Sequence, residues 1–371
     1  MTESRAGLRI LHTESSLGWG GQEIRVLTEA RGVARLGHEV TLAAPGEARI
    51  FREAGVYGVK AVELPIGRKR PAGVLALRTF LRENPFDVVN THSSTDTWLT
   101  AVACRMLAGA PPLVRTRHIS APLPANLATR WLYTRATNRI VTTGEKLREQ
   151  MMRETGIEAD RVVSIPTGID LGRFRPGVRS AARAAVGLPP EVPIVGIVAT
   201  LRSWKGHRYL LEAVAAMARK DVLVVVVGDG PQLEALQALA AKLGLAGRAR
   251  FAGNKADVAP WMQAFDVFCL PSYANEGVPQ ALMQAMACGL PVVTTPVGSI
   301  EEIVSDAVTG VLVPPEDAAR LQSALERLLG DPSERNALGQ RAAAAARERF
   351  GEERMVERMV AVFRAAAATR G

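Results

Sequence analysis

The chain has 371 residues, 47% of them hydrophobic and 22% charged, and this composition excludes a disordered chain, a collagen-like repeat and a coiled coil. Its 46 lysines and arginines outnumber its 37 aspartates and glutamates, which gives a formal net charge of +9. Such a surplus favours an anionic partner: nucleic acid, a membrane or a phosphorylated small molecule. A chain of this length is expected to fold as two domains.

The first half of the chain alternates predicted strands with predicted helices. Leu8–His12 is expected to be a buried strand, followed by a glycine-rich turn over 15–21 and a helix that ends at Gly37, which suits a left-handed C-cap. Further strands are expected at 38–44, 87–90, 113–116 and 139–143. Strands separated by helices indicate a parallel sheet.

The second half repeats this rhythm after the segment 165–176, which is rich in proline and glycine and which we interpret as the crossing between domains. Strands are expected at 193–199, 221–227, 250–252, 266–270, 291–295 and 310–313. We therefore predict an α/β protein of two doubly wound, Rossmann-like domains that face each other across a cleft, which is a usual place for a ligand.

The predicted domains cover residues 1–170 and 171–345, and residues 346–371 are assigned to a C-terminal helix. The helical pattern itself extends over about 338–368 and carries apolar side chains along one face: Met355, Val356, Met359, Val360 and Phe363. We expect this helix to pack back on the N-terminal domain. A helix that lies on a membrane surface is the alternative.

The cysteines and the hydropathy indicate the compartment. Cys104, Cys269 and Cys288 form no CxxC pair, which favours a reduced compartment over a disulfide framework. The N-terminal residues contain no apolar core of the length of a signal peptide. No apolar run reaches the roughly 18 residues of a membrane span. We expect a cytoplasmic protein whose membrane contact, if any, is peripheral.

Two parallel-sheet domains first suggest a dinucleotide-binding enzyme, but the glycine fingerprint is incomplete in both halves. Glu23 and Leu233 stand where G-x-G-x-x-G requires its third small residue. The sequence also lacks the P-loop pattern G-x-x-x-x-G-K-[ST] and the nucleophile elbow G-x-S-x-G. A dehydrogenase, a P-loop NTPase and a serine hydrolase are therefore disfavoured.

Two loops at predicted strand ends carry candidate chemistry. Glu276 and Gly277 follow the strand 266–270 and precede a helix, whose N-terminus would suit a phosphate. Glu276 would accept hydrogen bonds from ligand hydroxyls, or it would only cap the helix. Arg202 and Lys205 follow the strand 193–199 and can converge on a diphosphate, although two cations in a loop are equally typical of a solvated surface.

Several motifs in order resemble the retaining glycosyltransferases of family 4, which have the two-domain GT-B fold. The strings that carry the resemblance are GWGGQE, PTGID, KGH, VGDGP and EGVPQALMQAMACGLPVVTTPVGSIEEIV, and it extends over about residues 8–345. It implies a C-terminal domain that binds a nucleotide-sugar donor, most simply a UDP- or GDP-sugar, and an N-terminal domain that binds the acceptor. It also implies catalysis without a metal or another cofactor, and the sequence contains no D-x-D motif.

The resemblance implies roles for single residues. Lys205 would hold the diphosphate, Glu276 would bind the hydroxyls of the donor sugar, and His118 would lie against the reacting centre, although by itself His118 is an ordinary loop histidine. These three are the predicted catalytic residues. The predicted donor-binding residues are Gly20, Gly21, Arg202, Lys205, Gly228, Asn254, Glu276, Gly277, Val278 and Gln284.

The sequence departs from the family pattern in two places. Gln284 stands where the family has a second glutamate that binds the ribose, and an amide accepts a weaker hydrogen bond than a carboxylate does. Residues 199–201 read ATL where the family has GRL, so Arg202 is expected to take the place of that arginine. The identity of the nucleotide is therefore left open.

An arginine-rich segment is the candidate acceptor surface. Residues 97–144 contain six arginines and no carboxylate, with aromatic side chains among them. This pattern suits an anionic membrane or a phosphorylated glycolipid, although a solvated face over buried tryptophans has the same composition. Nucleic acid is disfavoured because no recognition motif accompanies the charge. The predicted acceptor or membrane contacts are Arg115, Arg117, Arg130, Trp131 and Arg135.

These observations predict a retaining, metal-independent hexosyltransferase. Its acceptor would be a lipid-linked or lipopolysaccharide-type saccharide of cell-envelope polysaccharide synthesis, and the enzyme would be peripheral to the inner face of the cytoplasmic membrane. Two alternatives stay open. One is a soluble glycosyltransferase that acts on a small sugar or sugar phosphate. The other, suggested by Gln284, is a non-catalytic homologue that binds nucleotide sugars.

Overall fold

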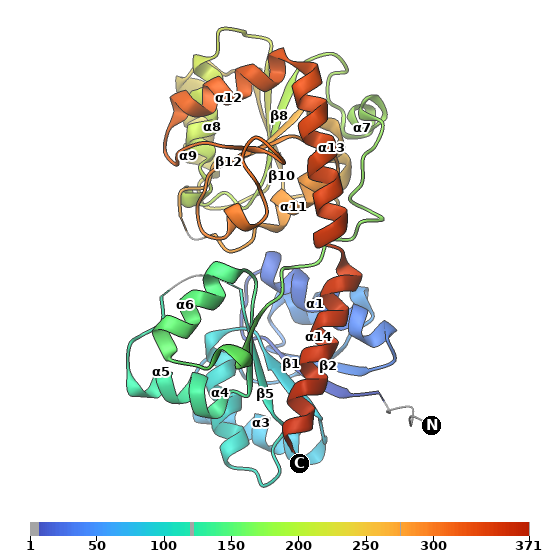
Figure 1. Cartoon of the computed structure of the whole chain (residues 1–371), viewed down its shortest axis with the longest axis vertical. Helices are drawn as coiled ribbons and strands as arrows, with labels where there is room; N and C mark the ends of the chain where they lie inside the picture. The colour runs from blue at the N-terminus through green and yellow to red at the C-terminus, as the bar shows by residue number, and fades with distance from the viewer. Residues whose placement is uncertain (1–6, 119–121, 275, 371) are drawn as a thin grey trace. The chain divides into compact units, whose positions relative to one another are not determined.

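The computed structural model describes residues 7–118, 122–274 and 276–370 (Figure 1). The chain divides into two compact units: unit 1 comprises residues 1–168 and 352–371, and unit 2 comprises residues 169–351. Each unit contains one parallel β-sheet with helices packed on both of its faces. The predicted α/β fold class, with two doubly wound sheets, is confirmed.

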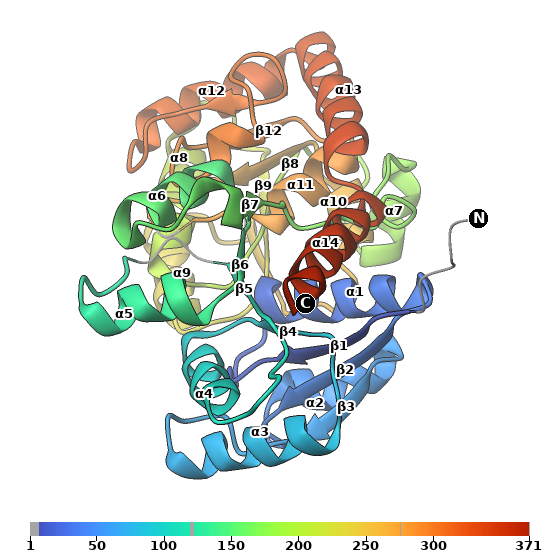
Figure 2. The same ribbon diagram turned by 60° about the horizontal axis from the view of Figure 1, so that its bottom comes forward.

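Unit 1 is built on a seven-stranded sheet in the order β3-β2-β1-β4-β5-β6-β7 (Figure 2). Its strands are β1 Arg9–Thr13, β2 Glu39–Ala44, β3 Lys60–Glu63, β4 Val88–Thr91, β5 Leu113–Arg117, β6 Arg139–Thr142 and β7 Val162–Ser164. Its α-helices are α1 Gly21–Arg35, α2 Arg49–Glu53, α3 Pro71–Glu83, α4 Ser94–Arg105, α5 Leu127–Trp131, α6 Glu145–Thr155 and α14 Glu352–Ala367. Short helical turns are η1 Ala54–Tyr57, η2 Leu132–Ala136, η3 Ala159–Arg161 and η6 Ala368–Arg370.

Alternate strand residues of unit 1 pack against different helices, as the period of two in a strand requires. Ile10 and Val88 pack against α1 and α14, whereas Leu11 and Val89 belong to the cluster formed with α3, α4 and α6. Helices α1 and α14 lie side by side in both views (Figures 1 and 2). Gly32 allows this approach, because a Cβ at its position would lie 2.3 Å from a methyl group of α14.

Unit 2 is built on a six-stranded sheet in the order β10-β9-β8-β11-β12-β13. Its strands are β8 Ile194–Val198, β9 Leu223–Val227, β10 Ala249–Gly253, β11 Val267–Leu270, β12 Val292–Thr294 and β13 Val311–Leu312. Its α-helices are α7 Arg179–Val186, α8 His207–Ala216, α9 Leu233–Lys242, α10 Ala259–Ala264, α11 Gln280–Ala287, α12 Ala318–Gly330 and α13 Pro332–Arg349. Its 3₁₀ turns are η4 Ser203–Lys205 and η5 Ile300–Glu302.

The two sheets change direction of winding at their centres. The change falls between β1 and β4 in unit 1 and between β8 and β11 in unit 2. In doubly wound sheets, ligands bind beyond the carboxyl ends of the strands at this switch point. The loops that follow β1, β4, β8 and β11 are therefore the first places to search for a functional site.

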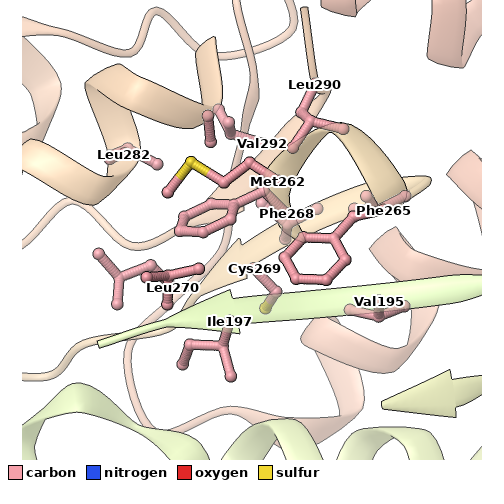
Figure 3. Close-up of a cluster of buried hydrophobic side chains, with 14 of the residues drawn as sticks. Val195, Ile197, Met262, Phe265, Phe268, Cys269, Leu270, Leu282, Leu290 and Val292 are labelled. Carbon is pink, nitrogen blue, oxygen red and sulfur yellow. The ribbon is translucent and has the colours of Figure 1, made fainter. Parts of the chain in front are cut away.

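The core of unit 2 holds β8 and β11 in place. Figure 3 shows Ile197 of β8 near Phe268 and Leu270 of β11, and all three are buried. Gly196 leaves space for the ring of Phe265, since a Cβ there would lie 2.0 Å from that ring. Full burial of each such apolar side chain stabilises the fold by roughly 1.5–3 kcal/mol. The two strands therefore form a rigid base for the loops that follow them.

The C-terminal segment is not the single helix predicted over about 338–368. It forms α13 and α14, which are interrupted at Phe350 and Gly351, where the chain leaves unit 2 and enters unit 1. The backbone N–H of Ile169 donates to the carbonyl of Phe350 at 2.7 Å, and this carbonyl is therefore taken by the neighbouring segment. Helix α14 buries its apolar face, including Met359 and Phe363, in the core of unit 1.

Candidate active site

Glycines with no room for a side chain bring the switch-point loops of unit 2 together. Gly206 has a φ of +74°, and a Cβ there would lie 1.9 Å from the carbonyl oxygen of Pro271 in the loop after β11. A Cβ on Gly298, in the loop after β12, would lie 2.0 Å from the carbonyl oxygen of Glu276. The loops after β8, β11 and β12 therefore pack into one layer, which we call the donor layer, residues 199–206, 271–274, 276–279 and 295–299.

Lys205 and Glu276 form an ion pair in the donor layer. The Nζ of Lys205 lies 2.6 Å from Oε1 of Glu276, and the hydroxyl of Ser272 donates to the same oxygen at 2.6 Å. The side chain of Glu276 is 4% exposed and that of Lys205 is 20% exposed, so the charges are largely shielded from water. The structure thus joins two residues that the sequence places 71 positions apart. A ligand phosphate would compete with Glu276 for the Lys205 ammonium.

Two helices start at the donor layer. Helix α8 begins at His207, directly after Lys205 and Gly206, and α11 begins at Gln280 after the N-cap residue Pro279. The N-terminus of a helix favours an anion through its N–H groups and its dipole. His207 is buried, and this burial, with the charge of Lys205, lowers its pKa to about 4. Its ring is therefore neutral and adds no charge to the site.

The other predicted donor-binding residues of unit 2 have different surroundings. Arg202 is exposed, and its guanidinium lies over the ring of Trp204 at 5.7 Å. Gly228 directly follows β9 beside the loop after β8, and a Cβ there would lie 2.0 Å from the carbonyl oxygen of Ala199. Asn254 is exposed on the loop after β10, and Gln284 is half-buried on α11.

The remaining predicted donor-binding residues lie just before the start of a helix or at its first residue. In unit 2, Gly277 and Val278 follow Glu276 and precede α11, with Val278 buried. In unit 1, Gly20 is the N-cap of α1 and Gly21 is its first residue. Their binding of a donor stays a prediction.

His118, the predicted catalytic histidine, follows β5 in unit 1 and is half-buried. Its Nε2 lies 3.1 Å from Nδ1 of His92. Burial, together with the charges of Arg25 and Arg115, holds the pKa of His118 well below its usual value. The ring is therefore neutral at pH 7 and is suited to hydrogen bonding rather than to proton release as an imidazolium.

Two buried carboxylates organise the switch-point loops of unit 1. Asp96, in the first turn of α4, accepts the backbone N–H groups of His92 and Ser93, each at 2.9 Å. Glu14, just after β1, accepts hydrogen bonds from the amide of Gln22 and the hydroxyl of Ser93. Burial, reinforced by the charge of Asp96, raises the pKa of Glu14 to about 7. These contacts join the loop after β4 to the glycine-rich turn before α1.

The predicted acceptor or membrane contacts separate into two groups. Arg115 and Arg117 are buried, because both lie on β5, a central strand of the sheet; neither can face a membrane, which corrects that part of the prediction. Arg130 and Arg135 are exposed, and Trp131 is half-buried with its ring stacked on Trp98 at 6.0 Å. Across the described ranges, no helix is both long enough and apolar enough to cross a membrane.

Candidate metal ligands are scattered over the described part of the chain. There, no three side chains of histidine, cysteine, aspartate or glutamate are grouped so that they could hold one metal ion.

The sequence reasoning missed Ser272 as a partner of Glu276, and it missed Glu14 and Asp96. A usable signal was present: each of these residues lies within a few positions of a strand end at a switch point.

Two doubly wound units, one of which pairs a lysine with a glutamate at its switch point, are the arrangement expected of a glycosyltransferase of the GT-B type. Residues 178–345 match the family described as Glycosyl transferases group 1, and residues 19–173 match Glycosyltransferase Family 4. The chain therefore belongs to the family 4 glycosyltransferases and is an enzyme that transfers a sugar.

Individual relatives agree with this assignment. The chain is 32% identical to the D-inositol 3-phosphate glycosyltransferase of Nocardia farcinica, over 91% of this chain and 79% of the relative. A glycosyltransferase from Rickettsia africae superposes with a TM-score of 0.87 at 19% identity, covering 97% of this chain and 98% of the other. Anabaena HepE in complex with UDP superposes with a TM-score of 0.84 at 21% identity, covering 96% and 100%. The two structures show the shared fold.

Proposed function

We propose that the protein transfers a hexose-type sugar, with retention of anomeric configuration, from a nucleoside-diphosphate sugar to a small polyol phosphate such as D-inositol 3-phosphate. The observation that supports this acceptor is the similarity, over 91% of this chain and 79% of the relative, to a protein named for that acceptor. The similarity favours a small phosphorylated acceptor over the lipid-linked saccharide that the arginine-rich segment 97–144 suggests.

The donor layer supports the first half of the proposal. As the bond between sugar and diphosphate breaks, negative charge develops on the departing diphosphate, and its stabilisation is usually the largest catalytic contribution. Lys205 and the N-terminus of α8 supply positive charge at one point of unit 2. Glu276 is engaged by Lys205 and Ser272, which favours a role in binding sugar hydroxyls over a role as nucleophile. We infer attack on the same face of the sugar, assisted by the leaving phosphate.

A basic loop in unit 1 supports a phosphorylated acceptor. Arg68, Lys69 and Arg70 are consecutive and exposed in the turn before α3. The Nζ of Lys69 lies 3.5 Å from the hydroxyl of Ser94, the first residue of α4, and thus close to the switch-point strand β4. A lysine beside a helix N-terminus suits a phosphate group.

The test is a transferase assay with matched variants. The wild-type enzyme is screened with UDP-, GDP- and ADP-sugars, and release of nucleoside diphosphate is measured with and without D-inositol 3-phosphate. We expect Lys69→Ala to raise the KM for the acceptor by roughly tenfold, since a charge-assisted hydrogen bond contributes about 1.5–3 kcal/mol. The KM for the donor should not change. Lys60→Ala is the control, because Lys60 is exposed at the amino end of β3. Release of nucleoside diphosphate by the wild type at the same rate with and without D-inositol 3-phosphate would contradict the proposal.

One observation favours a lipid-borne acceptor as a second candidate. Leu127, at the start of α5, is 85% exposed, and Arg130 and Arg135 are exposed close to it along the chain. An apolar side chain among arginines suits an anionic membrane surface. Liposome flotation distinguishes the candidates: Leu127→Asp should abolish binding to anionic vesicles if the acceptor is lipid-borne. Absence of wild-type binding to any vesicle would remove this candidate.

A further inference from the structure

Three histidines form a continuous row across the middle of the unit 1 sheet. His12 lies on β1, His92 directly follows β4 and His118 directly follows β5, and these three strands are neighbours. Nδ1 of His12 lies 2.9 Å from Nε2 of His92, and Nδ1 of His92 lies 3.1 Å from Nε2 of His118. We call this row the histidine ladder. Its nitrogens are in direct hydrogen-bond contact, with no space for an ion between them.

The strand register explains how the ladder forms. His12 is opposite Asn90, two residues before His92 on the same side of β4. The ladder therefore advances toward the carboxyl edge of the sheet as it passes from strand to strand. His12 and His92 are 0% and 1% exposed, whereas His118 is half-buried. The innermost ring, His12, meets the ring of Phe363 on α14 at a centroid distance of 5.9 Å and nearly at right angles.

All three rings are neutral at pH 7. Burial lowers the pKa of His12 to about 3. Burial and the neighbouring cationic groups, among them Arg115 and Arg25, hold the pKa values of His92 and His118 well below the usual range. Three neutral rings carry three ring protons, and each of the two contacts between rings uses one. The third proton is then either on Nε2 of His12 or on Nδ1 of His118.

We propose that His12 and His92 are positioning residues that fix His118 as the Nδ1–H tautomer, so that it offers one neutral hydrogen-bond donor to an oxygen atom of the substrate. The inner end of the ladder selects this arrangement. Nε2 of His12 is buried and has no hydrogen-bond partner among the residues that the structure describes, and a buried N–H without an acceptor is the rarer and costlier state. His12 therefore donates from Nδ1 to His92, and His92 donates from Nδ1 to His118. The catalytic use of the Nδ1–H group of His118 rests on the proposed function. The assignment of the tautomer does not depend on it.

The tautomer is directly measurable, because the chain contains only five histidines. Long-range ¹H–¹⁵N correlation spectra of the full-length protein labelled with ¹⁵N-histidine distinguish protonated from unprotonated ring nitrogens. We expect His118 to show a protonated Nδ1 and an unprotonated Nε2, and His12 and His92 to show the same pattern. A protonated Nε2 on His118, or a His118 protonated on both nitrogens at pH 7, would overturn the proposal.

His92→Phe removes the central ring nitrogens and keeps a planar side chain of similar size. We expect the ring of His118 to lose its fixed Nδ1–H tautomer and kcat to fall by roughly tenfold, as when one neutral hydrogen bond to the substrate is weakened, while the KM for the donor changes less than twofold. His38→Phe is the control: His38 is another buried histidine of unit 1, and its Nδ1 accepts the N–H of Leu8 at 2.9 Å. The control should lose some stability and leave both the His118 spectrum and kcat unchanged.

The outcomes separate the two proposals. If the wild type transfers no sugar to any acceptor, the proposed function fails while the spectra still decide the state of the ladder. If His92→Phe alters the His118 tautomer and kcat is unchanged, the positioning role is refuted. If this variant unfolds, His92→Gln, which retains a donor and an acceptor, is measured in the same way, and full activity without the Nδ1–H tautomer of His118 would again refute the role.

Discussion

Removal of the Lys205 side chain tests the donor layer at its centre. In the wild type, the Lys205 ammonium and the Ser272 hydroxyl both contact Oε1 of Glu276, each at 2.6 Å. Lys205→Ala leaves a carboxylate that is 4% exposed without its cationic partner. The variant is therefore expected to lose stability and activity through different physical causes, and the two losses can be separated.

The expected magnitudes follow from this geometry. Breaking a fully buried ion pair costs about 3–5 kcal/mol; because the Lys205 side chain is 20% exposed, we expect the loss of stability in unit 2 to be lower, roughly 2–3 kcal/mol. Loss of one group that stabilises charge in a transition state lowers kcat by about 10²–10³-fold. The double variant Lys205→Met with Glu276→Gln removes both charges, and its stability should return to within about 1 kcal/mol of the wild type.

Pulse hydrogen exchange in graded urea, read by peptide mass spectrometry, gives the unfolding midpoint of each unit separately. Turnover is measured by release of nucleoside diphosphate. We expect the double variant to recover stability and to remain at least a hundredfold slower than the wild type. Lys242→Ala, at an exposed position on α9, is the control for loss of a lysine. Near-normal turnover in either Lys205 variant would refute the role of this residue.

Three further predictions test other parts of the protein. The pKa of Glu14 is raised from 4.5 to about 7, so the folded unit holds a proton that the unfolded chain releases, and stability falls as the pH rises from 4.5 to 7. Relative to the wild type, Glu14→Gln should gain roughly 2–3 kcal/mol in unit 1 between pH 5 and pH 8, and a difference that is constant with pH would contradict this. Gln284→Glu should lower the Kd of the nucleotide by roughly fivefold in calorimetry, because a carboxylate makes the stronger hydrogen bond to ribose hydroxyls; weaker binding would show that Gln284 does not face the ribose. Transfer should continue at an unchanged rate in excess EDTA, and a loss that Mg²⁺ or Mn²⁺ restores would show that a metal ion takes part.

Most strands that the sequence predicts lie inside the two sheets, although the edge strands β10 and β13 of unit 2 were predicted as well. Strands such as β8 and β9 are continuous runs of buried apolar residues, and parallel strands covered on both faces have this pattern. The edge strand β3 was not predicted, because it is four residues long and none of them is buried. The edge strand β7 has three residues and only the first is buried. Because β3 and β7 are mostly not buried, they contain no run of buried apolar residues that the sequence could reveal.

The candidate site was predictable residue by residue, but its contacts were not. The motifs around Lys205 and Glu276 identify both side chains, whereas their ion pair depends on how closely the two loops approach, which Gly206 and Gly298 determine. The histidine ladder depends on the register between β1 and β4, which no local pattern specifies. Arg115 was assigned to a surface because its charge outweighed its position in a strand; the fold buries it on β5, and it donates to the carbonyls of Thr91 and Thr116.

The measurement that tests the central claim most directly is the anomeric configuration of the product. An α-linked nucleotide sugar, chosen from the donor that binds, is incubated with the wild-type enzyme and D-inositol 3-phosphate, and the reaction is followed by ¹H NMR. The account predicts that an α-glycoside appears at the rate at which nucleoside diphosphate is released, and that Lys205→Ala slows both signals equally. A β-glycoside, or hydrolysis of the donor without transfer to any phosphorylated acceptor, would contradict it.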